Sequence, residues 1–147
     1  NPELIHWTGP LGLPRFDLIL DQDFAPAFDT CLKLAADAVE AIAANPEPPG
    51  FDNTVAALET AEEPLNRLCA VFYTLTGVDS TPAREELQRQ IAPRLAAHGS
   101  KVSMDPRLFD RVEAISQDMD GLSPEDRRLT ELTLRGLRRA GLALAGR

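Results

Sequence analysis

Apolar side chains recur every three or four residues along most of the chain after residue 21. The first such stripe comprises Phe24, Phe28, Cys31, Ala35, Val39 and Ile42. This spacing places the side chains on one face of an α-helix. Asp21 or Asp23 can cap its beginning, and Pro26 is tolerated in its first turn, where the backbone N–H has no helical partner. Asn45 predicts its end, because the residue before a proline is pushed out of the α region, and Pro46 follows.

A proline-rich turn, NPEPPG at residues 45–50, separates the first stripe from the second. Its prolines limit the number of ways in which the chain can turn back. Asp52 and Asn53 then offer side-chain caps for a new helix. The second stripe comprises Val55, Leu58, Leu65, Leu68, Phe72 and Leu75. Because Pro64 interrupts this stripe, we expect a kink or two abutting helices there.

Three further helices are predicted to begin at a proline that follows a capping residue, as in Thr81-Pro82. Asp105-Pro106 and Ser123-Pro124 repeat this chemistry, and Pro93 allows a second kink. The three stripes are Leu87, Ile91, Leu95 and Val102; Leu108, Val112, Ile115 and Met119; and Leu129, Leu132, Leu137, Ala140 and Leu144. No strand-like alternation follows residue 21. The pattern predicts an all-α fold, an antiparallel array or bundle of about five to seven helices.

The beginning of the chain has a different character. Its turn formers are Pro2, Gly9, Pro10, Gly12 and Pro14. They predict an irregular arm with a short extended piece around residues 16–20. We therefore divide the chain into an N-terminal arm over residues 1–22, packed on the domain, and a helical domain over residues 23–147.

Composition narrows the classes of partner. A chain of 147 residues that is 44% hydrophobic fits one domain with a real core. The net charge of −8 argues against nucleic acid as a partner, because its phosphates would repel the chain. No apolar run is long enough to span a bilayer, so we expect no membrane partner either. The start, NPELIHWTG, lacks the character of a signal peptide. Cys31 and Cys69 fall inside apolar stripes, which predicts buried thiols in a reducing, cytoplasmic compartment.

The sequence contains no HExxH, GxSxG, Walker loop, GxGxxG or CxxC motif. Of the two histidines, His98 lies close to an apolar stripe and His6 lies beside Trp7, and packing roles are favoured for both. A zinc site built from these histidines with Cys31 and Cys69 is disfavoured, because no two of them are closely spaced as metal ligands usually are. We therefore predict no catalytic, cofactor-binding or metal-binding residue in this chain.

Charged residues gather in runs along the predicted helices. The acidic runs are Glu59, Glu62 and Glu63, and Glu85 and Glu86. They are interpreted as solvated helix faces, because paired carboxylates do acid–base work only when burial separates their pKa values. The basic residues of the last helix are Arg127, Arg128, Arg135, Arg138, Arg139 and Arg147. Two interpretations stay open for them: an exposed helix with cations near its C-terminus, and a docking face for an acidic neighbour.

Five segments carry a family resemblance. They are LPRFDLI at 13–19, DFAPAFD at 23–29, NPEPPGFDNTVAALE at 45–59, VFYTLTGVD at 71–79 and IAPRLAAHGSKVSMDPRLFDRV at 91–112. Their order and spacing resemble the N-terminal region of the M3 family of zinc oligopeptidases, with the peptidyl-dipeptidase and oligopeptidase A branches nearest. The resemblance covers essentially all of the chain, and its most specific parts are FDNT at 51–54 and the APRLAAHGS stretch.

The resemblance implies a function for a longer protein rather than for this chain alone. Family members are long helical enzymes that cleave short peptides in a deep channel, where an HExxH helix and a downstream glutamate hold zinc. That helix lies beyond residue 147, so no catalytic or zinc-binding residue can be placed here. The resemblance implies an N-terminal wall or lid of the channel, inactive by itself, whose partner is the missing catalytic domain.

Two hypotheses follow from different classes of protein. The first is the N-terminal part of a zinc metallopeptidase, which on its own can self-associate through surface that the rest of the enzyme would cover. The second is a free-standing helical interaction module. The length of the native reading frame discriminates between them.

Overall fold

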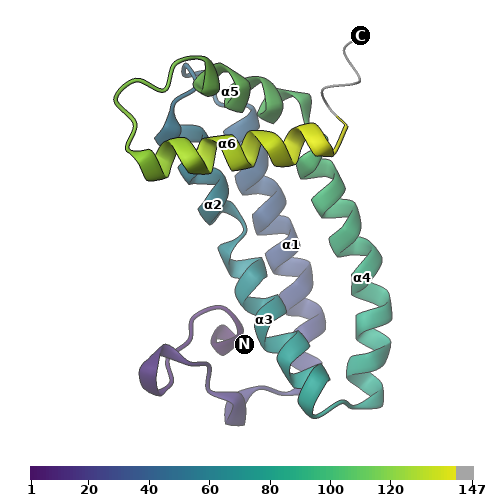
Figure 1. Ribbon diagram of the computed structural model, residues 1–147. Helices are drawn as coiled ribbons and strands as arrows, with labels where there is room; N and C mark the ends of the chain where they lie inside the picture. The colour runs from purple at the N-terminus through teal and green to yellow at the C-terminus, as the bar shows by residue number, and fades with distance from the viewer. Residues whose placement is uncertain (142–147) are drawn as a thin grey trace. The chain divides into compact units, whose positions relative to one another are not determined.

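The computed structural model describes residues 1–141, which form helices and turns and contain no strand (Figure 1). The α-helices are α1 (Asp21–Ala43), α2 (Ala57–Ala61), α3 (Glu63–Val78), α4 (Pro82–Ser103), α5 (Pro106–Gln117) and α6 (Pro124–Arg139). Short 3-10 turns cover Pro2–Leu4, Pro10–Gly12 and Phe16–Leu18, and a π-helical turn, Phe51–Ala56, precedes α2. The predicted all-α fold class is confirmed. None of the helices in residues 1–141 is long and apolar enough to cross a membrane.

The chain divides into two compact units. The first unit comprises residues 1–36 and 62–96, and the second comprises residues 37–61 and 97–147. Helices α1 and α4 each contribute residues to both units. Within the first unit, the successive segments from α1, α3 and α4 alternate in direction (Figure 1). Within the second unit, α5 and α6 pack against each other and against the π-helical turn.

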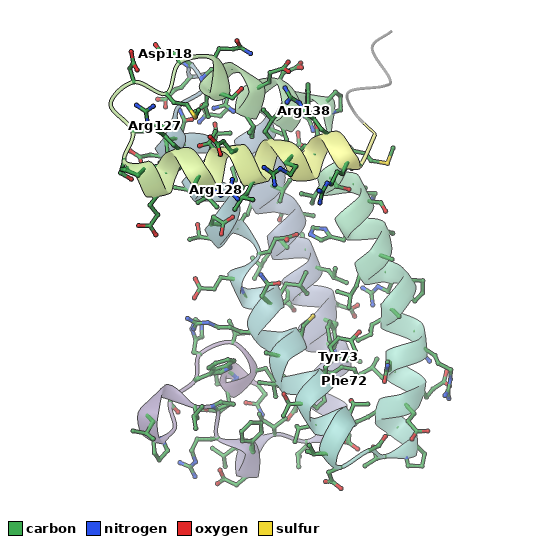
Figure 2. The ribbon with its side chains drawn as sticks, in the orientation of Figure 1. Phe72, Tyr73, Asp118, Arg127, Arg128 and Arg138 are labelled. Carbon is green, nitrogen blue, oxygen red and sulfur yellow. The ribbon has the colours of Figure 1, made fainter. Side chains whose placement is uncertain are left out.

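The core of the first unit is apolar and aromatic. Its buried side chains are Leu4, Ile19, Phe24, Ala27, Phe28, Cys31, Ala35, Leu65, Leu68, Val71, Phe72 and Ile91. Phe72, labelled in Figure 2, meets the rings of Phe24 and Phe28 edge-on, with centroid distances of 5.0 and 5.3 Å. Edge-to-face contacts of this kind are a preferred geometry for aromatic pairs. The predicted apolar faces of α1 and α3 thus meet in one core.

The N-terminal arm is folded around a buried carboxylate. The side chain of Glu3 accepts hydrogen bonds from the backbone N–H of Thr8 (3.3 Å), the Thr8 hydroxyl and the backbone N–H of Arg15 (3.2 Å). The hydroxyl bond is the main cause that holds the pKa of Glu3 below its ordinary value. The extended piece expected around residues 16–20 is wrong for Phe16–Leu18, which forms a 3-10 turn closed by a bond from the Ile19 N–H to the Phe16 carbonyl (3.3 Å).

The second unit contains two smaller apolar clusters. One comprises Val55, Val112, Ile115, Leu134 and Leu137, and the other comprises Val39, Ile42, Ala43 and Leu108. The predicted caps of its helices are present. Asp105 accepts the backbone N–H of Arg107 (2.8 Å) at the start of α5, and Ser123 accepts that of Asp126 (3.1 Å) at the start of α6.

The helix bounds test the two kinks that prolines could cause, and side-chain exposure tests the predicted inner face of the last helix. The predicted break near Pro64 is confirmed, because α2 ends at Ala61 and α3 begins at Glu63. Pro93, where a kink was allowed, lies inside a single helix, α4. The prediction that Leu132 lines the inner face of the last helix is wrong, because its side chain is 44% exposed. The buried positions of α6 are Thr130, Leu134 and Leu137, on the opposite side of the helix. Leu144 lies outside the described residues.

Candidate functional site

The residues considered for metal binding are distributed over both units. In the first unit, His6 is exposed, Cys31 is buried and Cys69 is half-buried, whereas His98 is half-buried in the second unit. Residues 1–141 contain no group of three or more histidine, cysteine, aspartate or glutamate side chains that could hold a metal ion. The described part of the chain therefore offers no fit for the zinc that the family resemblance implies. Both thiols are free, and burial raises the pKa of each, which lowers its thiolate fraction near neutral pH.

The acidic runs lie at the surface, with only Glu62 half-buried. Glu63 pairs with Arg67 on the same helix, and Glu85 accepts a hydrogen bond from the Ser80 hydroxyl (2.9 Å). Glu86 binds Arg89 and Gln90, both on α4. These contacts, at exposed positions, are those of solvated helix faces.

A buried arginine on α5 binds four polar groups of the second unit. Arg111 is only 7% exposed, and its guanidinium donates four hydrogen bonds. Its Nε binds the Thr54 hydroxyl (3.1 Å), and one terminal nitrogen binds the Asn53 side-chain oxygen (3.0 Å). The other terminal nitrogen binds the backbone carbonyls of Asn45 (2.9 Å) and Glu47 (3.2 Å). All four acceptors are neutral, and together they satisfy most of the donors of a buried cation.

Asn53 links the Arg111 cluster to the proline-rich turn at residues 45–50. Its side-chain oxygen also accepts the backbone N–H of Gly50 (2.9 Å) and the hydroxyl of Thr54 (2.9 Å). Its side-chain nitrogen donates to the Pro48 carbonyl (3.0 Å). Of the two caps predicted from the sequence, Asn53 therefore binds the residue that precedes the new helix. The turn is fixed to α5 from both of its ends.

Sequence reasoning did not identify Arg111. The only signal was its position, because an arginine at residue 111 falls between Leu108 and Ile115 at the spacing of a buried helix face. Spacing alone does not show that two carbonyls, an amide and a hydroxyl surround that position. The acceptors come from residues 45–54, more than fifty positions earlier in the chain.

The basic residues of α6 differ in whether a carboxylate of residues 1–141 lies close to them. Figure 2 labels Arg127 and Arg128 near the beginning of the helix and Arg138 near its end. Arg128 pairs with Glu131 (3.3 Å), Arg138 pairs with Glu113 of α5 (3.2 Å), and Arg127 lies 3.9 Å from Asp120. Arg135 and Arg139 are exposed, and no carboxylate within residues 1–141 pairs with either. Arg147 lies outside the described residues.

Almost the whole chain is similar in sequence to part of two known proteins. No family model matches it. The dipeptidyl carboxypeptidase of Escherichia coli is 35% identical over 147 residues, and that of Salmonella typhimurium is 33% identical over the same length. Each alignment covers 99% of this chain but 22% of the relative. The chain thus spans about a fifth of the length of these curated relatives.

Proposed function

Because its similarity to dipeptidyl carboxypeptidases confirms the resemblance to the M3 family, we propose that this chain is the N-terminal helical region of a longer zinc metallopeptidase. The observation that carries the proposal is a match over 99% of the chain that accounts for only 22% of each relative. The remaining length leaves room for the catalytic helix and its zinc. Within this proposal, residues 1–22 are an arm, residues 23–147 are a helical domain, and the enzyme is cytoplasmic.

The proposed role of the region is to shape the channel through which peptides reach the catalytic site. A wall or lid made of packed helices admits short, flexible peptides and excludes folded proteins. Such a wall has to keep its form, and the Arg111 cluster supports this requirement. Arg111 of α5 donates two hydrogen bonds to the proline-rich turn and two to the π-helical turn that follows it. The chemistry belongs to the catalytic domain, which is the proposed partner of this chain.

A hybrid enzyme tests the proposed role in substrate selection. This chain would replace the matching 22% of the E. coli relative, and the hybrid would be given a short quenched-fluorescence peptide and a folded protein in parallel. We expect hydrolysis of the short peptide and no cleavage of the folded protein. A folded, zinc-loaded hybrid that cleaves the folded protein as readily as the peptide would contradict a channel-shaping role.

The alternative, a free-standing interaction module, is favoured by the exposed apolar side chains of the arm. The most exposed are Leu11, Leu13, Leu18 and Leu20, at 50–98% of their maximum. Four exposed leucines within one short segment favour a contact with another protein or with a second copy. The native reading frame decides between the two functions. Continuation to an HExxH motif supports the peptidase region, whereas a stop codon near Arg147 supports the module.

A further inference from the structure

We infer that the outward face of α6 docks this chain on an acidic segment of the catalytic domain of the longer enzyme. The outward face comprises Arg128, Leu132, Arg135 and Arg139. The inference rests on the proposed function and adds to it the surface and the chemistry of the contact.

The geometry of α6 separates this face from the core. Its four residues are spaced by four, three and four, so they lie together on one side of the helix. The opposite side holds Thr130, Leu134 and Leu137, which are buried at 0%, 6% and 7% exposure. By contrast, Leu132 is 44% exposed, and the Arg128 side chain is 57% exposed. The outward face is therefore not needed to hold the second unit together.

The charges on the outward face are incompletely compensated within residues 1–141. Arg128 has Glu131 as a partner, but no carboxylate in this part of the chain pairs with Arg135 or Arg139. Like charges four residues apart on a helix repel each other, which costs stability. An acidic partner would remove this cost and supply the missing acceptors.

Charge complementarity points to an acidic protein segment. Residues 127–141 contain five arginines and one glutamate, whereas residues 1–126 contain nine basic and 22 acidic residues. A symmetric contact with a second copy would bring arginine against arginine, which opposes that arrangement. The phosphates of nucleic acid would be repelled by the chain's net charge of −8. The occupant favoured by these charges is a protein surface rich in carboxylates.

The outward face also has the composition of a small interface. A guanidinium can bind a carboxylate through two parallel hydrogen bonds, which fixes both distance and orientation. Leu132 lies among the three arginines and offers an apolar centre with a charged rim. Because the catalytic domain would be covalently linked to this chain, even a modest contact would be occupied, through its high effective concentration.

Hydrogen exchange of the α6 amides tests the inference in the hybrid enzyme described above. The amides of residues 129–141 would be compared between the isolated 147-residue chain and the hybrid. We expect exchange at least about tenfold slower in the hybrid, because an interface adds to the protection given by the helix. The double variant Arg135→Glu/Arg139→Glu should abolish this slowing in the hybrid, whereas Lys101→Glu, an exposed charge reversal in the same unit, should leave it intact.

Two controls keep the outcomes separate. In the isolated chain, the double variant should keep the helix content and the unfolding midpoint, since both arginines are exposed; the milder Arg135→Gln/Arg139→Gln repeats the test without added negative charge. An active hybrid whose α6 is no slower than in the isolated chain, or whose slowing survives the double variant, would overturn the docking inference alone. A hybrid without peptidase activity would count against the proposed function itself. Equal protection in an isolated chain that sediments as a dimer would assign the face to a second copy and also overturn the inference.

Discussion

The two units of the molecule are stabilised by different kinds of interaction. In the first unit, Phe24 and Phe28 pack edge-on against Phe72 in a continuous apolar core. In the second unit, the apolar clusters are smaller, and the buried polar residues Arg111 and Thr54 lie among them. The first unit therefore depends mainly on the burial of apolar area, and the second depends in addition on hydrogen bonds with defined partners.

The two units should therefore differ in how well they tolerate amino-acid substitutions. An apolar core accepts substitutions that conserve volume, because dispersion and the hydrophobic effect are not directional. A buried guanidinium requires acceptors at set distances, and an acceptor that loses its donor pays the cost of desolvation. We therefore expect the proline-rich turn to have one well-defined conformation, set by Arg111, and the two units to respond differently to substitution.

The largest expected effect is in the first unit. Phe72→Ala removes a fully buried ring that lies edge-on to three other rings, those of Phe24, Phe28 and Tyr73. The loss should lower the free energy of unfolding by about 3–5 kcal/mol. Chemical denaturation followed by circular dichroism measures this. Leu34→Ala, on the exposed side of α1, is the matched control and should change it by no more than about 0.5 kcal/mol. Equal losses in the two variants would show that the aromatic cluster is not the centre of the unit.

The next effect is in the second unit and tests its polar character. Arg111→Met keeps much of the side chain's volume but removes the donor of two backbone carbonyls and of the Thr54 hydroxyl oxygen, and one of the three donors of the Asn53 oxygen. The expected cost is about 3 kcal/mol. Arg107→Met is the control on the same helix. Arg107 binds Glu40 and Asp105 at the surface and should contribute no more than about 1 kcal/mol. If Arg111→Met proves as stable as the wild type, the turn is held without Arg111, by its prolines and by the bonds of Asn53 to Pro48 and Gly50.

A smaller effect compares the two faces of α6. Leu134→Ala should cost about 2–3 kcal/mol, because Leu134 is buried against the second unit's core, whereas Leu132→Ala should be nearly neutral in the isolated chain. Thermal unfolding of both variants measures the contrast. A destabilising Leu132→Ala would mean that the outward face already packs against something in the isolated chain.

The smallest effect concerns pH and the arm. The pKa of Glu3 is held below its ordinary value of 4.5, so the ionised form stabilises the folded arm above that pH. The contribution is lost as pH falls through the lowered pKa, when Glu3 takes up a proton. The protection of the Thr8 and Arg15 amides, relative to the exchange of an unstructured chain at the same pH, should therefore fall on acidification below about pH 4.5. In Glu3→Gln these two amides should already be less protected at pH 7, and their protection should change less with pH. Identical protection at every pH in both proteins would show that Glu3 does not stabilise the arm.

The helices could be predicted from the sequence more completely than the buried hydrogen bonds. Apolar spacing predicted the inner face of α1 and most of that of α5, because those helices bury one stripe each. Met119, the last member of the predicted α5 stripe, lies after the end of the helix at Gln117 and is half-buried. The spacing failed on α6, where leucines lie on both sides and Thr130 is buried in place of Leu132. Thr130 is accommodated because its hydroxyl donates to the Asp126 carbonyl (2.8 Å), which satisfies a polar group inside the unit. The partners of Arg111 come from a distant part of the chain, and no local pattern contains that information.

The central claim is that this chain contributes shape, and not catalytic chemistry, to a zinc peptidase. Hydrolysis of a quenched-fluorescence peptide, measured side by side for the 147-residue chain and for the hybrid with the E. coli relative, tests it most directly. Both proteins would be stripped with a chelator and reloaded with zinc. The account predicts zinc-dependent turnover by the hybrid and none by the chain alone. Zinc-dependent turnover by the chain alone, lost in the double variant His6→Ala/His98→Ala, would contradict it.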